Sequence, residues 1–167
     1  PGPFGGNLDL KRLTKGTSLF LPVLVPGGMF CCGDAHAAQG NGEVGITAIE
    51  TCGLLATFQF VVHKDFPLDS PQAETPTHYI VTGLDRDLNE SMRKATFHAA
   101  RFLCRRNDLS FEEAVMLCSA AVDFEVSQFV DGVVGIHGMI PKTIVQKSEI
   151  PFWNADGSVF YKGNPWF

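Results

Sequence analysis

The chain has 167 residues, 45% of them hydrophobic and 19% charged, which is typical of a folded globular protein rather than a disordered one. Its length fits one ordinary domain or one half of a larger one. The net charge of −5 argues against nucleic acid or an anionic membrane surface as the main partner, because both favour basic proteins.

The cysteines and the hydropathy pattern indicate a cytoplasmic protein. There are five cysteines, an odd number, and their spacings match no paired zinc-knuckle pattern. Reduced thiols are therefore expected. No apolar run approaches the roughly 18 residues of a membrane span, and no signal peptide is visible.

The first 63 residues are predicted to form a β-rich module, because glycine-containing turn signals recur at short spacing. Pro22 places the first strand at a sheet edge or introduces a bend. The sequence predicts strands over 17–25, 29–32, 44–50 and 54–63.

Residues 64–145 are predicted to form an α+β portion of the same domain. Helical spacing of apolar residues indicates a helix over 89–106 with Asn89 as its N-cap. Ser110 and Glu113 form a capping-box pattern, which opens a second helix that ends near residue 121. A connector over 64–77 precedes strands predicted over 78–84, 125–130 and 133–140.

The expected fold class is α+β. A β-rich first half carries the site loop, and a sheet with two helices packed on one of its faces follows. Residues 146–167 form a third segment, an aromatic-rich C-terminal tail in which Asn154 to Gly157 would make the turn of a hairpin. Because such a tail needs to be buried, we expect a homo-oligomer or another partner.

Side chains that can bind a metal ion gather in the segment 33–43, which reads GDAHAAQGNGE. In an extended segment Asp34 and His36 point to the same face, and the glycines that follow allow the chain to bring Glu43 back toward them. Aspartate, histidine and glutamate together suit a divalent ion, with zinc the expected one. Such an ion would activate water for hydrolysis. A structural histidine beside a capping aspartate is the alternative.

Several separated motifs resemble, in the same order, those of the acetamidase/formamidase family. They are GGNLD at 5–9, GT at 16–17 leading into LPV at 21–23, GDAHAAQGNGE at 33–43, AIE at 48–50, TPTHYI at 75–80, EEA at 112–114, MLCS at 116–119, VSQ at 126–128, VDG at 130–132 and IHGMIPK at 136–142. The resemblance covers residues 2–145 and the C-terminal portion of the family. It implies hydrolysis of short amides such as formamide and acetamide to a carboxylate and ammonia.

The resemblance also implies roles for individual residues. Asp34 and His36 are expected as metal ligands, and Glu43 as a third ligand or as the base that takes the proton of water. Asp34 thus has both a metal-binding and a catalytic role. Asn7 and Asp9 lie in the GGNLD motif, where one of them is expected near the site and an Asx-turn is the alternative for each. Gln39 would contact the substrate amide or orient a ligand. Asn7 is also expected to contact the substrate.

Asp9 is a weaker candidate than Asp34, His36 and Glu43, and so are three further residues. Glu50 would support a ligand from behind or serve as a strand-end charge. His78 would face the site or form a hydrogen bond at the entry of a strand. His137 lies in an apolar segment, where a core histidine is the favoured interpretation.

The sequence thus predicts a metal-dependent hydrolase of short aliphatic amides. Family members have a preceding half that also lines the site, and this chain opens with Pro1 rather than Met, so we expect a processed or truncated piece that associates with an upstream half. Two alternatives remain. One is a non-catalytic fragment or subunit that acts in assembly or binding. The other is a thiol-dependent amidase that uses Cys52 or Cys118 with a histidine base.

Overall fold

A five-stranded antiparallel sheet organises the computed structural model, which describes residues 1–51, 53, 55–64 and 68–146. Its strand order is β1-β4-β5-β7-β6, and β2 and β3 form a separate antiparallel pair. The elements are β1 (Ser18–Phe20), β2 (His36–Ala38), β3 (Ile49–Glu50), β4 (Gln72–Glu74), β5 (His78–Asp85), α1 (Leu88–Asn107), α2 (Phe111–Ala121), β6 (Asp123–Gln128), β7 (Val134–Pro141) and the 3-10 helix η1 (Lys142–Ile144). The predicted hairpin of the aromatic tail and Cys52 lie outside the described residues.

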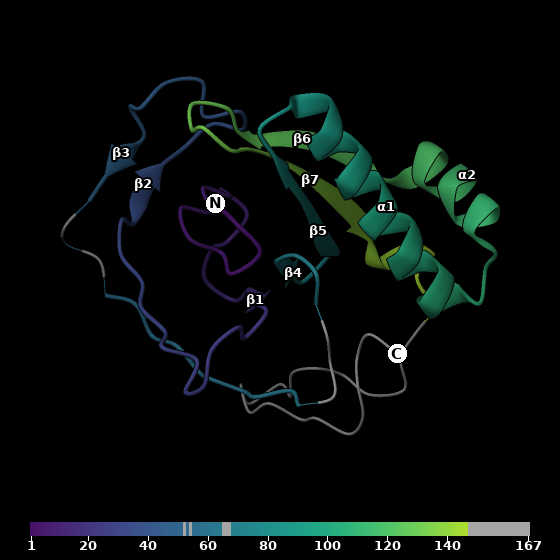
Figure 1. Ribbon diagram of the computed structural model, residues 1–167, viewed down its shortest axis with the longest axis horizontal. Helices are drawn as coiled ribbons and strands as arrows, with labels where there is room; N and C mark the ends of the chain where they lie inside the picture. The colour runs from purple at the N-terminus through teal and green to yellow at the C-terminus, as the bar shows by residue number, and fades with distance from the viewer. Residues whose placement is uncertain (52, 54, 65–67, 147–167) are drawn as a thin grey trace.

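Both long helices lie on the same side of the sheet, as Figure 1 shows. Helix α1 packs on β5 and β7, and α2 packs on α1. Residues that face the helices, among them Val81 and Ile140, form one buried core with Leu103 and Cys118 of the helices. The predicted α+β class, with two helices on one face of a sheet, is confirmed. Among the described residues, no helix is both long and apolar enough to span a membrane.

The N-terminal coil covers the opposite face of the sheet. Because side chains alternate along a strand, Ile80 and Met139 point away from the helices and pack with Leu10 of the coil in a second, smaller core. His137 shares this face, since it lies two residues before Met139 in β7. Its register partner in β6 is Glu125, so polar side chains also occupy this face.

The strands of the first half are shorter than predicted. Only three residues of the predicted strand 17–25 pair, with β4, and the ladder ends before Pro22, which cannot continue it. The predicted strands over 29–32 and 54–63 are wrong for the residues described there, and the one over 44–50 reduces to β3. In Figure 1 the chain after β1 runs as a wide arc around the N-terminal coil, with β2 and β3 paired on it. Elsewhere on this arc, apart from an isolated bridge to β6, the described residues have no neighbouring strand to bond their backbone. Strand β4 was missed because it lies inside the proline-rich connector.

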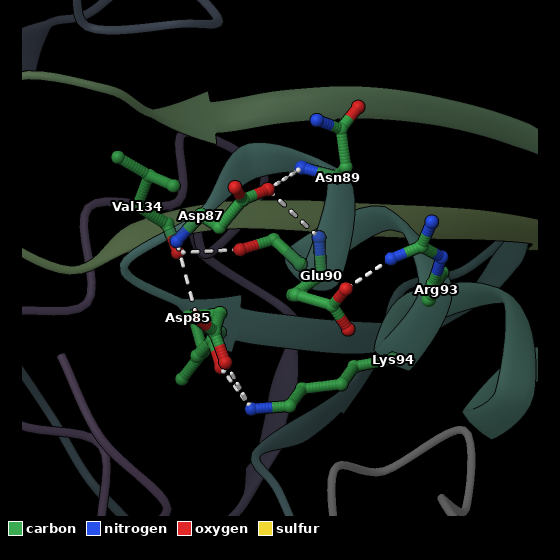
Figure 2. A network of polar contacts seen from close by, with 9 residues as sticks. Asp85, Asp87, Asn89, Glu90, Arg93, Lys94 and Val134 are labelled. Carbon is green, nitrogen blue, oxygen red and sulfur yellow. Dashed lines mark hydrogen bonds and ion pairs between the residues drawn. The ribbon is translucent and has the colours of Figure 1, made fainter.

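The helix ends follow side-chain capping. Asp87, rather than the predicted Asn89, is the N-cap of α1, and its Oδ1 accepts hydrogen bonds from the amides of Asn89 at 2.7 Å and Glu90 at 3.2 Å (Figure 2). Asp85 fixes this turn, because it accepts the Asp87 amide at 3.1 Å and binds Lys94 at 2.5 Å. The predicted capping box of α2 is confirmed.

Asp87 should stabilise helix α1 as its N-cap, whereas Asn89 should not. We expect Asp87→Ala to lower the free energy of unfolding by about 1 kcal/mol, because two amides at the helix start lose their acceptor. Asn89→Ala is the matched control and should change stability by less than about 0.5 kcal/mol, since its side chain caps nothing. Urea denaturation monitored by circular dichroism measures both. A larger loss for Asn89→Ala would contradict the assignment.

Candidate functional site

Three segments distant in the sequence meet at the end of β6 (Figure 1): residues 7–9, the loop 33–43 and residues 128–131. Backbone contacts join the loop to the strand, because Gly42 forms a bridge with Gln128 and donates its amide to the carbonyl oxygen of Ser127 at 3.2 Å. The meeting point carries four carboxylates and one imidazole, those of Asp9, Asp34, His36, Glu43 and Asp131.

The first group of potential ligands combines Asp9, Asp34 and His36. One ligand atom of each lies within 4.8 Å of the other two. Nε2 of His36 is 3.4 Å from Oδ1 of Asp34, and the two side chains are 11% and 54% exposed. Burial disfavours the charged imidazole, but the hydrogen bond to Gln39 and the Asp34 and Asp9 carboxylates outweigh it and raise the pKa of His36. The two carboxylates of this ligand group therefore favour a positive charge between them and His36.

Gln39 orients the His36 ring. Its Nε2 donates to the backbone oxygen of Asp9 at 3.1 Å, which can only accept. The amide oxygen of Gln39 must then face Nδ1 of His36, 3.4 Å away. That oxygen also only accepts, so Nδ1 carries the proton. In the neutral ring the lone pair of Nε2, on the side of Asp34, is then free to bind a cation. This is the tautomer that a metal ligand needs.

The second group combines Asp9, Glu43 and Asp131, again with one ligand atom of each within 4.8 Å of the others. Burial, followed by repulsion from Asp9 and Asp131, raises the pKa of Glu43. The pKa of Asp9 is raised by burial and then by Asp131, while His36 lowers it. Asp9 belongs to both groups and so links them.

The site loop has an unusual backbone. Asp34 has φ +57° and Glu43 has φ +32°, and such values are uncommon for residues other than glycine. Gly42, at φ +97°, permits the reversal that directs Glu43 back toward Asp9. Two of the predicted site residues thus occupy sparsely populated backbone conformations, as residues of functional sites often do.

A partly buried polar network anchors the loop to the sheet. Glu125 accepts hydrogen bonds from Arg12 and from Asn41 of the loop. Its pKa is lowered because contacts with Arg12 outweigh the effect of burial. His137 is fully buried, bonds Ser127 through Nδ1 at 2.9 Å, and has its pKa lowered to about 4 by burial. It is therefore a neutral core histidine that belongs to neither ligand group.

The other predicted residues lie as follows. The Asn7 amide donates to Oδ2 of Asp9 at 2.8 Å, so it holds a carboxylate. Glu50 is opposite His36 in the β2–β3 ladder but is exposed and in neither group. His78 bonds Thr77 at the start of β5, roughly 20 Å along the sheet from the site at about 3.3 Å per residue.

Two residues of the site escaped the sequence interpretation. Asp131 supplies a carboxylate to the second group, and Gln128 bonds both Asp9 and Asp131. Each lies within a motif that resembles the family, VSQ at 126–128 and VDG at 130–132. These two motifs could have indicated Gln128 and Asp131, but the sequence alone suggested no chemical role for either residue.

The thiol-dependent alternative is disfavoured by Cys118. This residue is buried beneath α2 in the helix-facing core, 2% exposed. Burial, followed by the neighbouring Cys104, raises its pKa to about 11. A nucleophilic thiol needs a lowered pKa and access to substrate, so Cys118 lacks both properties.

The donor set fits a divalent cation. Nε2 of His36 and Oε2 of Glu43 are buried atoms without a hydrogen-bond partner among the described residues, although buried polar atoms usually have one. Both atoms belong to the two ligand groups, in which the negative charges of the carboxylates repel each other. Imidazole nitrogen with carboxylate oxygen is a ligand combination suited to zinc and similar ions.

Known proteins are similar to this chain in sequence and in fold. The model of the acetamidase/formamidase family matches residues 1–147. A formamidase of Methylophilus methylotrophus is 32% identical over 152 residues, which cover 78% of this chain and 37% of the relative. The crystal structure of an acetamidase from Bacillus halodurans has 35% identity and a TM-score of 0.75, and covers 86% of this chain and 48% of that one. An acetamidase structure from Yersinia enterocolitica has 29% identity and a TM-score of 0.77, and the match covers 87% of this chain and 44% of that one. The chain spans less than half the length of each.

Proposed function

The chain belongs to the acetamidase/formamidase family, and from this premise we propose that it contributes the metal-binding part of a site that hydrolyses short aliphatic amides to a carboxylate and ammonia. The observation that carries the proposal is the convergence of Asp9, Asp34 and His36, with Glu43 and Asp131 beside them. The formamidase and acetamidase names of the relatives support the substrate class.

Each residue has a chemical task in this proposal. Asp9, Asp34 and His36 would hold a divalent ion, with zinc the expected one. When bound, the ion would polarise the amide carbonyl and make water a better nucleophile. Gln39 keeps His36 in the required tautomer.

Glu43 is the proposed base. Its Oε2 has no hydrogen bond to any residue that the structure describes, and Glu43 lies beside the Asp9 carboxylate that both groups share. Glu43 would take one proton from the attacking water as the new C–O bond forms. As the C–N bond breaks, it would return that proton to the leaving nitrogen, which departs as ammonia.

We propose that another polypeptide surface completes the site. Val44 and Ile46 follow Glu43 directly and are 85% and 83% exposed. Phe30 and Phe60 pack edge to face with ring centroids 4.8 Å apart and yet are 50% and 66% exposed. Apolar exposure on this scale is typical of an interface. The complementary half of the family fold is the proposed partner, and homo-oligomer formation is the alternative.

The proposed compartment is the cytoplasm. Cys31, Cys32, Cys104 and Cys118 are all free thiols. Free thiols fit a reducing environment, where disulfides are rare.

The test is ammonia release from formamide and acetamide by the purified chain, alone and with the complementary half of a family member. We expect activity to disappear after treatment with a chelator and to return on addition of zinc, because the carboxylate cluster needs its cation. Activity that survives chelation but is lost on alkylation of the cysteines would favour a thiol-dependent amidase. A chain that gives no activity in either preparation would favour the assembly role.

A further inference from the structure

Gln128, the last residue of β6, is fully buried, and within the described part of the chain its side-chain amide bonds only to residues of the site. Its Oε1 accepts the backbone amide of Asp9 at 3.0 Å. Its Nε2 lies 3.1 Å from Oδ2 of Asp9 and 2.5 Å from Oδ2 of Asp131. The same nitrogen lies 2.9 Å from the backbone oxygen of Asn7. One side chain therefore joins residues more than a hundred positions apart.

We propose that Gln128 is the positioning residue that holds the carboxylates of Asp9 and Asp131 together for binding of a divalent cation. The inference rests on the proposed function, because it presumes that these carboxylates meet a cation. It adds a residue that acts through the proposed ligand Asp9 and through Asp131 beside it, without touching the ion itself.

The orientation of the amide follows from the backbone. The Asp9 amide can only donate a hydrogen bond, so it requires the oxygen end of Gln128. The nitrogen end must then face the two carboxylates, which can only accept when ionised. The backbone amide of Asp9 alone fixes the orientation of the Gln128 side chain. Its nitrogen end therefore faces the carboxylates before any cation binds.

A neutral donor suits this position better than a charged one. Two carboxylates close together repel each other. The two buried N–H groups of Gln128, shared among these carboxylates and the Asn7 oxygen, offset part of that cost. Gln128 contacts Oδ2 of each aspartate. Oδ1 of each therefore stays available to a cation. A lysine would neutralise the cluster and compete with the ion.

The rival interpretation is that Gln128 only closes the end of the sheet, where its backbone bridges to Gly42. That role needs no side-chain amide. The two interpretations differ in what removal of the amide does to cation affinity when the fold is kept.

The experiment measures the affinity of Co²⁺ for the purified full chain, together with the visible absorption of the bound ion. The variant is Gln128→Met, which keeps the side-chain length and removes both hydrogen-bonding ends. The matched control is Gln72→Met in β4, whose side-chain oxygen has no hydrogen-bond partner. Circular dichroism checks that both variants fold.

We expect Gln128→Met to weaken Co²⁺ binding about 10- to 100-fold, as loss of a partner behind a ligand does, and Gln72→Met to leave it unchanged. Equal affinity in the wild type and Gln128→Met overturns the positioning role alone. A wild type that binds no Co²⁺ overturns the metal site as well, so the two failures are distinguishable. If Gln128→Met does not fold, Gln128→Glu is measured at pH 7. Weaker binding by this variant supports the role, and equal or tighter binding overturns it.

Discussion

Replacing Asp9 by Asn is expected to abolish both divalent-ion binding and amide hydrolysis, although the sequence ranked Asp9 below Asp34, His36 and Glu43. Asp9 is the one carboxylate common to both ligand groups, so its loss weakens both at once. The ion affinity should fall at least about 100-fold, the upper end of what loss of a residue behind a ligand costs.

Isothermal titration with Zn²⁺ and an ammonia-release assay measure the two effects of Asp9→Asn. Asp123→Asn is the matched control, because Asp123 is an exposed aspartate at the other end of β6. It should leave both values unchanged. If Asp9→Asn keeps its zinc affinity while Asp34→Asn loses it, Asp9 is not the shared ligand.

Gly83→Ala should cost at least about 3 kcal/mol of folding free energy, at the upper end of the range for overpacking. Gly83 lies in β5 where α1 crosses closest to the sheet. A Cβ atom there would overlap the backbone oxygen of Ser91 and the backbone nitrogen of Ala95. Because both are backbone atoms of a helix, relief requires that α1 move away from β5.

Gly132→Ala is the matched control for Gly83→Ala. A Cβ atom at Gly132 meets nothing within 4 Å, and the residue is exposed. Its stability should change by less than about 1 kcal/mol. Guanidinium denaturation compares the two variants, and a similar unfolding midpoint for both would show that α1 does not pack on β5 as described.

Local signals in the sequence were sufficient to predict much of the secondary structure in the second half of the chain. Ser110 and Glu113 specify a helix start through contacts three residues apart, and the structure contains that capping box. Asn89 was mistaken for the N-cap of α1 because asparagine is a favoured N-cap residue and stands at the start of the predicted helix. Asp87 takes the role because Asp85 fixes the turn before it, a contact that hydropathy does not reveal.

The first half was harder to predict because strands need partners. The apolar run 55–63 has β propensity, but no neighbouring strand pairs with it among the described residues. Exposed side chains such as Val62, at 76%, are the consequence. Propensity alone does not supply the hydrogen bonds that a strand requires.

The site could be predicted only in part for the same reason. Asp34, His36 and Glu43 lie within ten residues, so their spacing suggested an ion. Asp131 joins Glu43 only because Gly42 docks on the end of β6. That juxtaposition depends on tertiary structure, which no local pattern encodes.

The most direct test of the metal site is an anomalous difference map from crystals of the chain grown with Zn²⁺. We predict a peak among the side chains of Asp9, Asp34 and His36, within reach of Glu43. No peak there, or a peak only at the exposed Cys31 and Cys32, would contradict the assignment of this cluster as a metal centre.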